Sequence, residues 1–219
     1  MKKLYYLFLI LFSVFGFSQS ITVNTTTYTV PNLVQDVLID SPCALVSNFS
    51  SSSTCGIGYF QYSGTNFDFS SGMILRNGTA ASTAGGFTGT ADETTICSNS
   101  GDADLLAISN ASGQTETIND VTYVQFDFTP LTDNFSFNFV FASNEYGQFQ
   151  CDYADVFAFI LTDLTTNTST NLAVIPGTTT PVSVISIRDA ANNNNCASQN
   201  VAFFDTFYQN PTPPATSTP

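Results

Sequence analysis

The sequence predicts an all-β fold: a two-layer β-sandwich of the jelly-roll type, with one short N-terminal helix and long polar loops. Phe and Tyr are abundant, with 21 and 9 copies among 219 residues, and aromatic residues favour strands. The clearest signal lies at 134–143, where Phe135, Phe137, Phe139 and Phe141 occupy alternate positions. Such alternation places four rings on one face of a strand. A second sheet is expected to cover that face.

Residues 1–20 have the pattern of a signal peptide and are excluded from the predicted fold. Lys2 and Lys3 precede an apolar run from Leu4 to Phe15, and small residues follow that run. Cleavage after Ser18 and cleavage after Ser20 both satisfy the small-residue rule. The apolar run is too short and wrongly flanked for a membrane anchor, so no membrane insertion is expected once it is removed.

A single domain is predicted over residues 21–208. Residues 209–219 form a Pro/Thr-rich linker whose composition cannot pack into a core, so further domains are expected downstream. A short helix is expected after Pro31, because proline suits a first helical turn and the next apolar residues have helical spacing. The predicted strands, in chain order, are 21–30, 44–47, 58–62, 73–75, 121–129, 134–143, 155–161, 171–175 and 182–187.

Turn residues join some of these strands in a specific way. The turn from Pro130 to Asp133 predicts that 121–129 and 134–143 form an antiparallel hairpin. The uncharged run at 155–161 predicts a central strand buried on both faces. Residues 76–104, rich in Gly, Ser, Thr and Asn, are expected to form long loops.

The charge balance excludes several classes of protein. The chain has 4 Lys and Arg against 17 Asp and Glu. Without Lys2 and Lys3 of the signal, only Arg76 and Arg188 oppose the 17 acids, so the mature net charge is −15. Such a chain repels nucleic acid and anionic lipid. Because His is absent, His-assisted Ser and Cys nucleophiles are excluded as well.

Five cysteines lie in the mature chain, and export to an oxidising compartment makes disulfides the expectation. Cys43 and Cys55 flank a polar loop, and Cys151 and Cys196 lie in polar loops beside core strands. These positions predict the bonds Cys43–Cys55 and Cys151–Cys196, with Cys97 left single. The absence of His and of C-x-x-C spacing argues against zinc.

The densest polar group consists of Asn144, Glu145, Asp152 and Asp155, around a short loop between apolar strands. Carboxylates with an amide can supply the oxygen ligands of Ca²⁺, the natural hard cation outside cells. The competing interpretation is a loop whose acids bind main-chain N–H groups. A weaker acidic pair is Asp102 with Asp104. Two carboxylates are also what glycoside hydrolysis requires, and Glu145 with one of the aspartates is the candidate pair.

Six short motifs stand out in the sequence: Phe139-Val-Phe-Ala-Ser-Asn-Glu-Tyr-Gly147, Asp155-Val-Phe-Ala-Phe-Ile-Leu161, Cys55-Gly-Ile-Gly-Tyr-Phe60, Ser71-Gly-Met-Ile-Leu75, Gly101-Asp-Ala-Asp-Leu105 and Asn171-Leu-Ala-Val-Ile-Pro-Gly-Thr178. With these motifs the chain resembles one known family, the Choice-of-anchor L domain of Bacteroidetes, especially flavobacterial, surface proteins. The resemblance implies an N-terminal position in a large exported protein that carries a C-terminal signal for type IX secretion, in some members with a gliding-motility region. It implies an adhesin-like or display role.

Three hypotheses for function follow. The first is a secreted or surface-exposed binding module for extracellular polysaccharide or another cell-surface ligand, which is not an enzyme and takes no cofactor beyond Ca²⁺. The second is a polysaccharide-active enzyme, or its accessory domain, that uses the carboxylate pair. The third is a passive structural spacer. The sequence alone does not separate the first hypothesis from the third.

Overall fold

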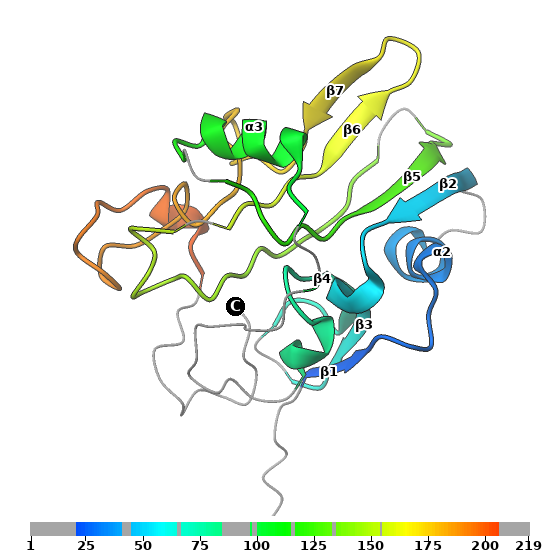
Figure 1. Cartoon of the computed structure of the whole chain (residues 1–219), viewed down its shortest axis with the longest axis horizontal. Helices are drawn as coiled ribbons and strands as arrows, with labels where there is room; N and C mark the ends of the chain where they lie inside the picture. The colour runs from blue at the N-terminus through cyan, green and yellow to red at the C-terminus, as the bar shows by residue number, and fades with distance from the viewer. Residues whose placement is uncertain are drawn as a thin grey trace, which may run out of the picture.

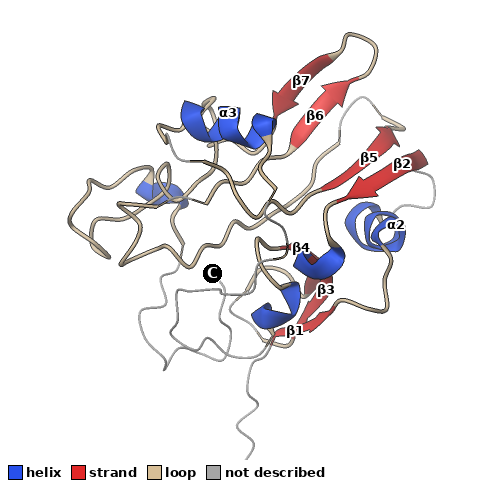
Figure 2. Cartoon of the chain, viewed as in Figure 1, coloured by secondary structure: helices blue, strands red, loops and turns tan. Residues whose placement is uncertain are grey.

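The computed structural model describes residues 21–40, 45–64, 67–84, 97, 100–114, 117–132, 135–153 and 155–205. The predicted signal peptide, the predicted linker at 209–219 and Cys43 lie outside these ranges. The all-β prediction is confirmed, since the fold is made mostly of strands in small antiparallel sheets (Figures 1 and 2). The two-layer sandwich stays a prediction.

The first sheet has three antiparallel strands in the order β1–β3–β4. They are β1 (Ile21–Asn24), β3 (Ile57–Tyr62) and β4 (Ser71–Leu75). Each overlaps a predicted strand, because alternating apolar residues bury one side of the sheet. Ile21, Ile57 and Tyr62 are among its buried side chains.

The predicted N-terminal helix is present. It consists of α2 (Val30–Asn32) and the π-helical turn η1 (Leu33–Ile39). The Thr29 side chain caps it by accepting from the Asn32 N–H at 3.4 Å, and Pro31 lies in the first turn. Leu33 and Val34 are buried. The helix therefore contributes to the core of this half of the domain.

The predicted hairpin of 121–129 with 134–143 is wrong in its pairing. β5 (Val124–Thr129) forms where the sequence predicts a strand, but its partner is β2 (Leu45–Ser51). A strand that is followed by a turn can still pair with a strand from a distant part of the chain. The short separation of two segments in the sequence does not reveal which partner is used.

The Phe-rich segment at 135–143 is extended but is not part of a hydrogen-bonded strand among the described residues. Its rings pack on both neighbours: Phe135 on Phe128 at 5.6 Å, Phe137 on Phe159 at 3.8 Å, and Phe139 on Phe157 at 5.0 Å. The segment thus runs between β5 and the residues leading into β6 (Figure 1). Phe135 and Phe139 remain 42% and 38% exposed, so the expected complete cover over the four rings is absent.

The part of the fold that follows β5 contains few regular strands. β6 (Ile160–Asp163) and β7 (Thr168–Asn171) form a projecting hairpin (Figure 1). The predicted strands 155–161, 171–175 and 182–187 otherwise meet through the isolated bridges Val156↔Ser183 and Val174↔Pro181 and through single main-chain hydrogen bonds, such as that from the Val182 N–H to the Ala173 carbonyl at 3.1 Å. Their apolar side chains still form the local core, namely Ala173, Ile175, Val182 and Val184.

One helix was not expected. α3 (Ala103–Ala111) begins inside the region assigned to loops and extends beyond it. The remaining short helical turns are η2 (Thr54–Gly56), η3 (Ala80–Thr83) and η4 (Val201–Phe203). In the described ranges no helix has the length and apolar character needed to cross a membrane.

Candidate functional site

Two disulfides fix the loops of the domain. Cys151 is bonded to Cys196, as predicted. The other prediction is wrong: Cys55 is bonded to Cys97 and not to Cys43. β2 explains this result, because its seven residues run extended between positions 43 and 55 and span about 20 Å. The Asp120 carboxylate accepts a hydrogen bond from the Cys97 N–H at 3.1 Å, where Cys97 is bonded to Cys55.

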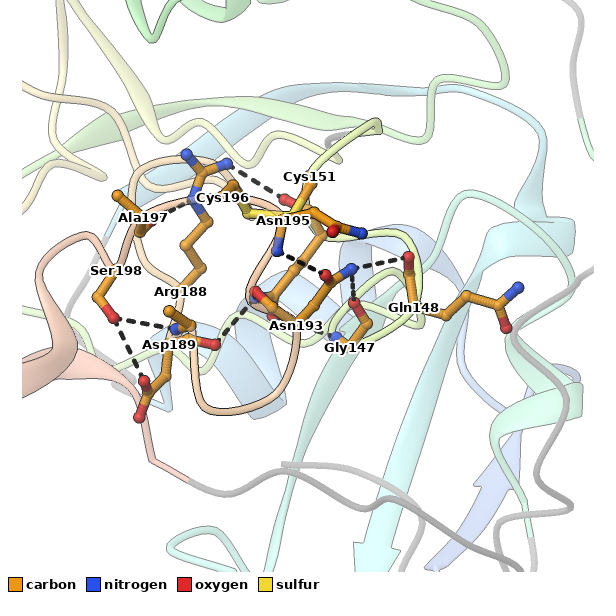
Figure 3. Close-up of a disulfide and its surroundings, with 12 residues drawn as sticks. Gly147, Gln148, Cys151, Arg188, Asp189, Asn193, Asn195, Cys196, Ala197 and Ser198 are labelled. Carbon is orange, nitrogen blue, oxygen red and sulfur yellow. Dashed lines mark hydrogen bonds between the residues drawn. A yellow bond between two sulfur atoms is a disulfide. The ribbon is translucent and has the colours of Figure 1, made fainter.

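The Cys151–Cys196 bond joins two polar loops, 147–153 and 188–198, which we call the stapled loops (Figure 3). Gln150, with no exposed surface, lies at their junction. Its side-chain amide donates to the Asp189 carbonyl at 2.9 Å and to the Asn193 carbonyl at 3.3 Å. Its side-chain oxygen accepts from the Gly147 N–H at 3.2 Å. A buried amide that is satisfied in this way fixes one loop against the other.

Arg188 and Asn193 complete the junction from the second loop. The Arg188 guanidinium donates to the Gln150 carbonyl at 3.2 Å and to the Ala197 carbonyl at 3.0 Å. The Asn193 amide donates to the carbonyls of Gly147 and Gln148 at 2.9 and 3.1 Å (Figure 3). One of the two arginines of the chain therefore donates to neutral carbonyls and positions these loops.

The outer surface of the stapled loops is polar with one prominent ring. Tyr153 is 56% exposed, and its ring lies 5.8 Å from that of Phe149. Four further polar side chains of the two loops are exposed, namely those of Gln148, Asp152, Asn194 and Asn195. Gln148 points away from the junction (Figure 3). The loops thus present an aromatic face, amides and a carboxylate on a rigid support.

Glu145 and Asp155 lie together just before and after the first stapled loop. The Glu145 carboxylate accepts from the Asp155 N–H at 2.8 Å. The Asp155 carboxylate accepts from the Ser143 hydroxyl at 2.8 Å and from the Asn77 amide at 3.0 Å. The Ser143 oxygen in turn accepts from the Glu145 N–H at 3.1 Å. We call this group of four residues the carboxylate clamp.

Burial changes the acidity of the clamp. Desolvation, and then the negative charge of Asp155, raise the pKa of Glu145 from 4.5 to about 7. Desolvation also raises the pKa of Asp155, against the lowering effect of its bonds from Ser143 and Asn77. The pKa of Tyr146 is raised by desolvation and by Asp155. A pKa of about 7 means that Glu145 is partly protonated near neutral pH, beside a second buried carboxyl group whose pKa is also raised.

The four residues predicted to bind Ca²⁺ are not gathered around one point. Glu145 and Asp155 meet in the clamp, whereas the side chains of Asn144 and Asp152 are exposed. Within the described part of the chain, no three acidic, His or Cys side chains are grouped so that they could hold a metal ion. The interpretation that competed with a Ca²⁺ site was a loop whose acids bind main-chain N–H groups. Glu145 fits that interpretation, because its carboxylate accepts from the Asp155 N–H.

The weaker acidic pair has a structural explanation. Asp102 is the N-cap of α3, and its carboxylate accepts from the Leu105 N–H at 2.8 Å. Asp104 lies in the first turn of the same helix, where a negative charge is favourable. Sequence reasoning missed Gln150, Arg188 and Asn193, although the predicted Cys151–Cys196 bond already brought their loops together.

Comparison with known proteins identifies the family of the chain. The family model described as Choice-of-anchor L domain matches residues 22–218. No curated protein and no solved structure matches the chain with significance. Two disulfides suit an extracellular or surface location. The chain therefore belongs to the Choice-of-anchor L family of cell-surface-associated domains.

Proposed function

We propose that this chain is an exported, adhesin-like domain that binds extracellular polysaccharide through its stapled loops. The observation that carries the proposal is the exposed ring of Tyr153 on a loop fixed by a disulfide, where the two bonded loops also expose amide and carboxylate side chains. Membership of a surface-associated family supports the setting. The acidic composition supports a neutral ligand over an anionic one.

The chemistry of the loops suits a sugar. A pyranose ring has an apolar C–H face that packs on an aromatic ring, and its hydroxyls pair with amides and carboxylates. Asp152 directly precedes Tyr153 in the sequence, Gln148 lies five residues before it, and both side chains are exposed. Because the Gln150 junction and the disulfide hold the loops before a ligand arrives, little conformational entropy is lost on binding.

Glycan arrays followed by calorimetry test the proposal, with the wild-type domain measured with and without Ca²⁺. Tyr153→Ala is expected to weaken binding about tenfold or more, since an aromatic anchor typically contributes over 1 kcal/mol. Tyr123→Ala is the matched control, because Tyr123 is 42% exposed beside β5 and away from the stapled loops. Absence of any glycan binding, or equal loss in both variants, would contradict the proposal.

The enzyme hypothesis is favoured by one observation: Glu145, with a pKa of about 7, lies beside a second carboxyl group. A glycosidase needs one protonated and one ionised acid. Both groups of the clamp, however, are already engaged by the protein's own N–H and hydroxyl donors, which supports binding over hydrolysis. Release of reducing ends from polysaccharide, lost in Glu145→Gln, would establish the enzyme instead.

The proposed export begins with the signal peptide at 1–20. Expression of the full chain with its native leader, followed by N-terminal sequencing of the secreted product, is expected to give a start at Gln19 or Ile21. A product that retains Lys2 and Lys3 would contradict export by this signal. The route beyond the inner membrane, by type IX secretion, is part of the same proposal.

A further inference from the structure

The carboxylate clamp occupies the two ends of the loop that contains Cys151. Glu145 lies at the start of this loop and Asp155 at its end, and a hydrogen bond of 2.8 Å joins the Glu145 side chain to the Asp155 N–H. Ser143 bonds to both ends, and Asn77, which follows β4, ties Asp155 to the first sheet. The clamp therefore closes the two ends of the loop and attaches them to the first sheet, in addition to the attachment of its middle through Cys151 and Gln150.

We propose that the carboxylate clamp is a proton-controlled latch, which closes the 145–155 loop when the pair carries one proton and loosens it when both acids are ionised. In the closed state the single negative charge resides on Asp155, where the Ser143 hydroxyl and the Asn77 amide neutralise it in part. A second charge on Glu145 would have, in the described part of the chain, the Asp155 N–H as its hydrogen-bond donor and a like charge beside it.

Other charged groups near the clamp offer little compensation. Tyr146, the neighbour of Glu145, stays neutral because its pKa is raised, and its ring packs on Phe204 at 5.1 Å. The segment that bonds to the Asp155 main chain, Val182 to Val184, has no titratable side chain. Two charged residues are next in sequence to residues that contact the clamp or its neighbour Tyr146. Arg76 precedes Asn77 and donates to the Thr83 hydroxyl at 3.1 Å, and Asp205, exposed, follows Phe204.

The sign of the pH dependence follows from the direction of the shift. The pKa of Glu145 in the folded domain, about 7, lies above the ordinary value of 4.5. The folded state therefore holds this proton more tightly than the open loop does. The stabilisation is complete below about pH 4.5 and is lost as the pH rises through about 7. The latch is thus closed in mildly acidic surroundings and loosened in alkaline ones.

Hydrogen exchange measured by mass spectrometry at pH 5.5 and pH 8, corrected for intrinsic exchange rates, tests the latch. In the wild type, protection of the 143–155 amides is expected to fall about tenfold between the two conditions, while the β6–β7 hairpin serves as internal reference. Glu145→Gln, which keeps an acceptor oxygen but does not ionise, should abolish most of this fall. Asp152→Asn, an exposed acid in the same loop, should behave as wild type.

Two results would overturn the inference: unchanged protection in the wild type, or the same fall in Glu145→Gln. If that variant does not fold, the carboxyl resonance of Glu145 is titrated by NMR in the wild-type domain. An apparent pKa near 7 supports the latch, and an ordinary value refutes it. None of these measurements requires a glycan, so failure of the latch and failure of the proposed function are distinguishable.

Discussion

Replacing both Cys151 and Cys196 with serine removes the bond that joins the stapled loops. The two residues are 45 positions apart. On the chain-entropy model, opening a loop of this length costs about 4 kcal/mol of folding stability, because the unfolded chain regains its freedom. The hydrogen bonds of Gln150, Arg188 and Asn193 remain in the serine variant. They act in the folded state and leave that entropic loss unchanged.

Urea unfolding followed by tyrosine fluorescence measures the effect, since the chain has nine Tyr and no Trp. The double-serine variant should have a clearly lower midpoint than the oxidised wild type. Cys43→Ser is the matched control: the other four cysteines are bonded to one another, so this change breaks no bond within the chain. A wild-type midpoint in the double variant, or a lowered one in Cys43→Ser, would refute the pairing and its assigned contribution.

A variant that lacks the second disulfide provides a comparison for this test. Cys55 and Cys97 are 42 positions apart, so the same model assigns their bond nearly the same stabilisation. A Cys55→Ser, Cys97→Ser variant should therefore lose stability within a few tenths of a kcal/mol of the first variant. A much larger loss at Cys151 and Cys196 would mean that the Gln150 junction fails without its disulfide, and entropy alone would not account for the bond.

Three further predictions concern stability, each measured by urea unfolding. Asp102→Ala should cost about 1 kcal/mol because it removes the N-cap of α3, whereas Asp104→Asn should cost only a few tenths; equal losses would contradict the cap. Ile175→Ala should cost about 2–5 kcal/mol, since the side chain is buried and leaves a cavity; a loss below 1 kcal/mol would place Ile175 outside the core. Gly56→Ala should destabilise strongly, because its Cβ would lie within 3 Å of the Arg76 carbonyl oxygen; a neutral effect would refute that close approach.

Local signals in the sequence predicted much of the first sheet. β1, β3 and β4 and the helix after Pro31 appear where alternation and helix-start residues place them. The sequence did not predict α3, although an aspartate suited to capping a helix lies at its start. The Gly- and Ser-rich residues before it predicted loops as far as residue 104. The cap was visible in the sequence, but two acids with one residue between them also fit a metal loop, and only the Leu105 N–H bond distinguishes the two.

The Phe-rich segment shows which features of the fold a local sequence pattern does not predict. Its alternation predicted a strand, but the described residues form no strand there, although the rings of Phe137 and Phe139 do pack on another segment. It did not indicate which strand pairs with β5, nor that Phe135 and Phe139 stay partly exposed. Alternation fixes which side chains share a face, but the element that covers that face comes from elsewhere in the chain.

The sequence by itself determined the all-β class, the acidic and His-free chemistry and the family, and it predicted one of the two disulfides, Cys151–Cys196. The tertiary structure alone decided that Cys55 meets Cys97, that Gln150 locks the stapled loops, and that Glu145 and Asp155 meet while Asp152 turns outward. The physical reason is that composition and periodicity act over a few residues. Pairings across 40 or more positions depend on how whole segments pack, and burial then sets the proton affinity of groups such as Glu145.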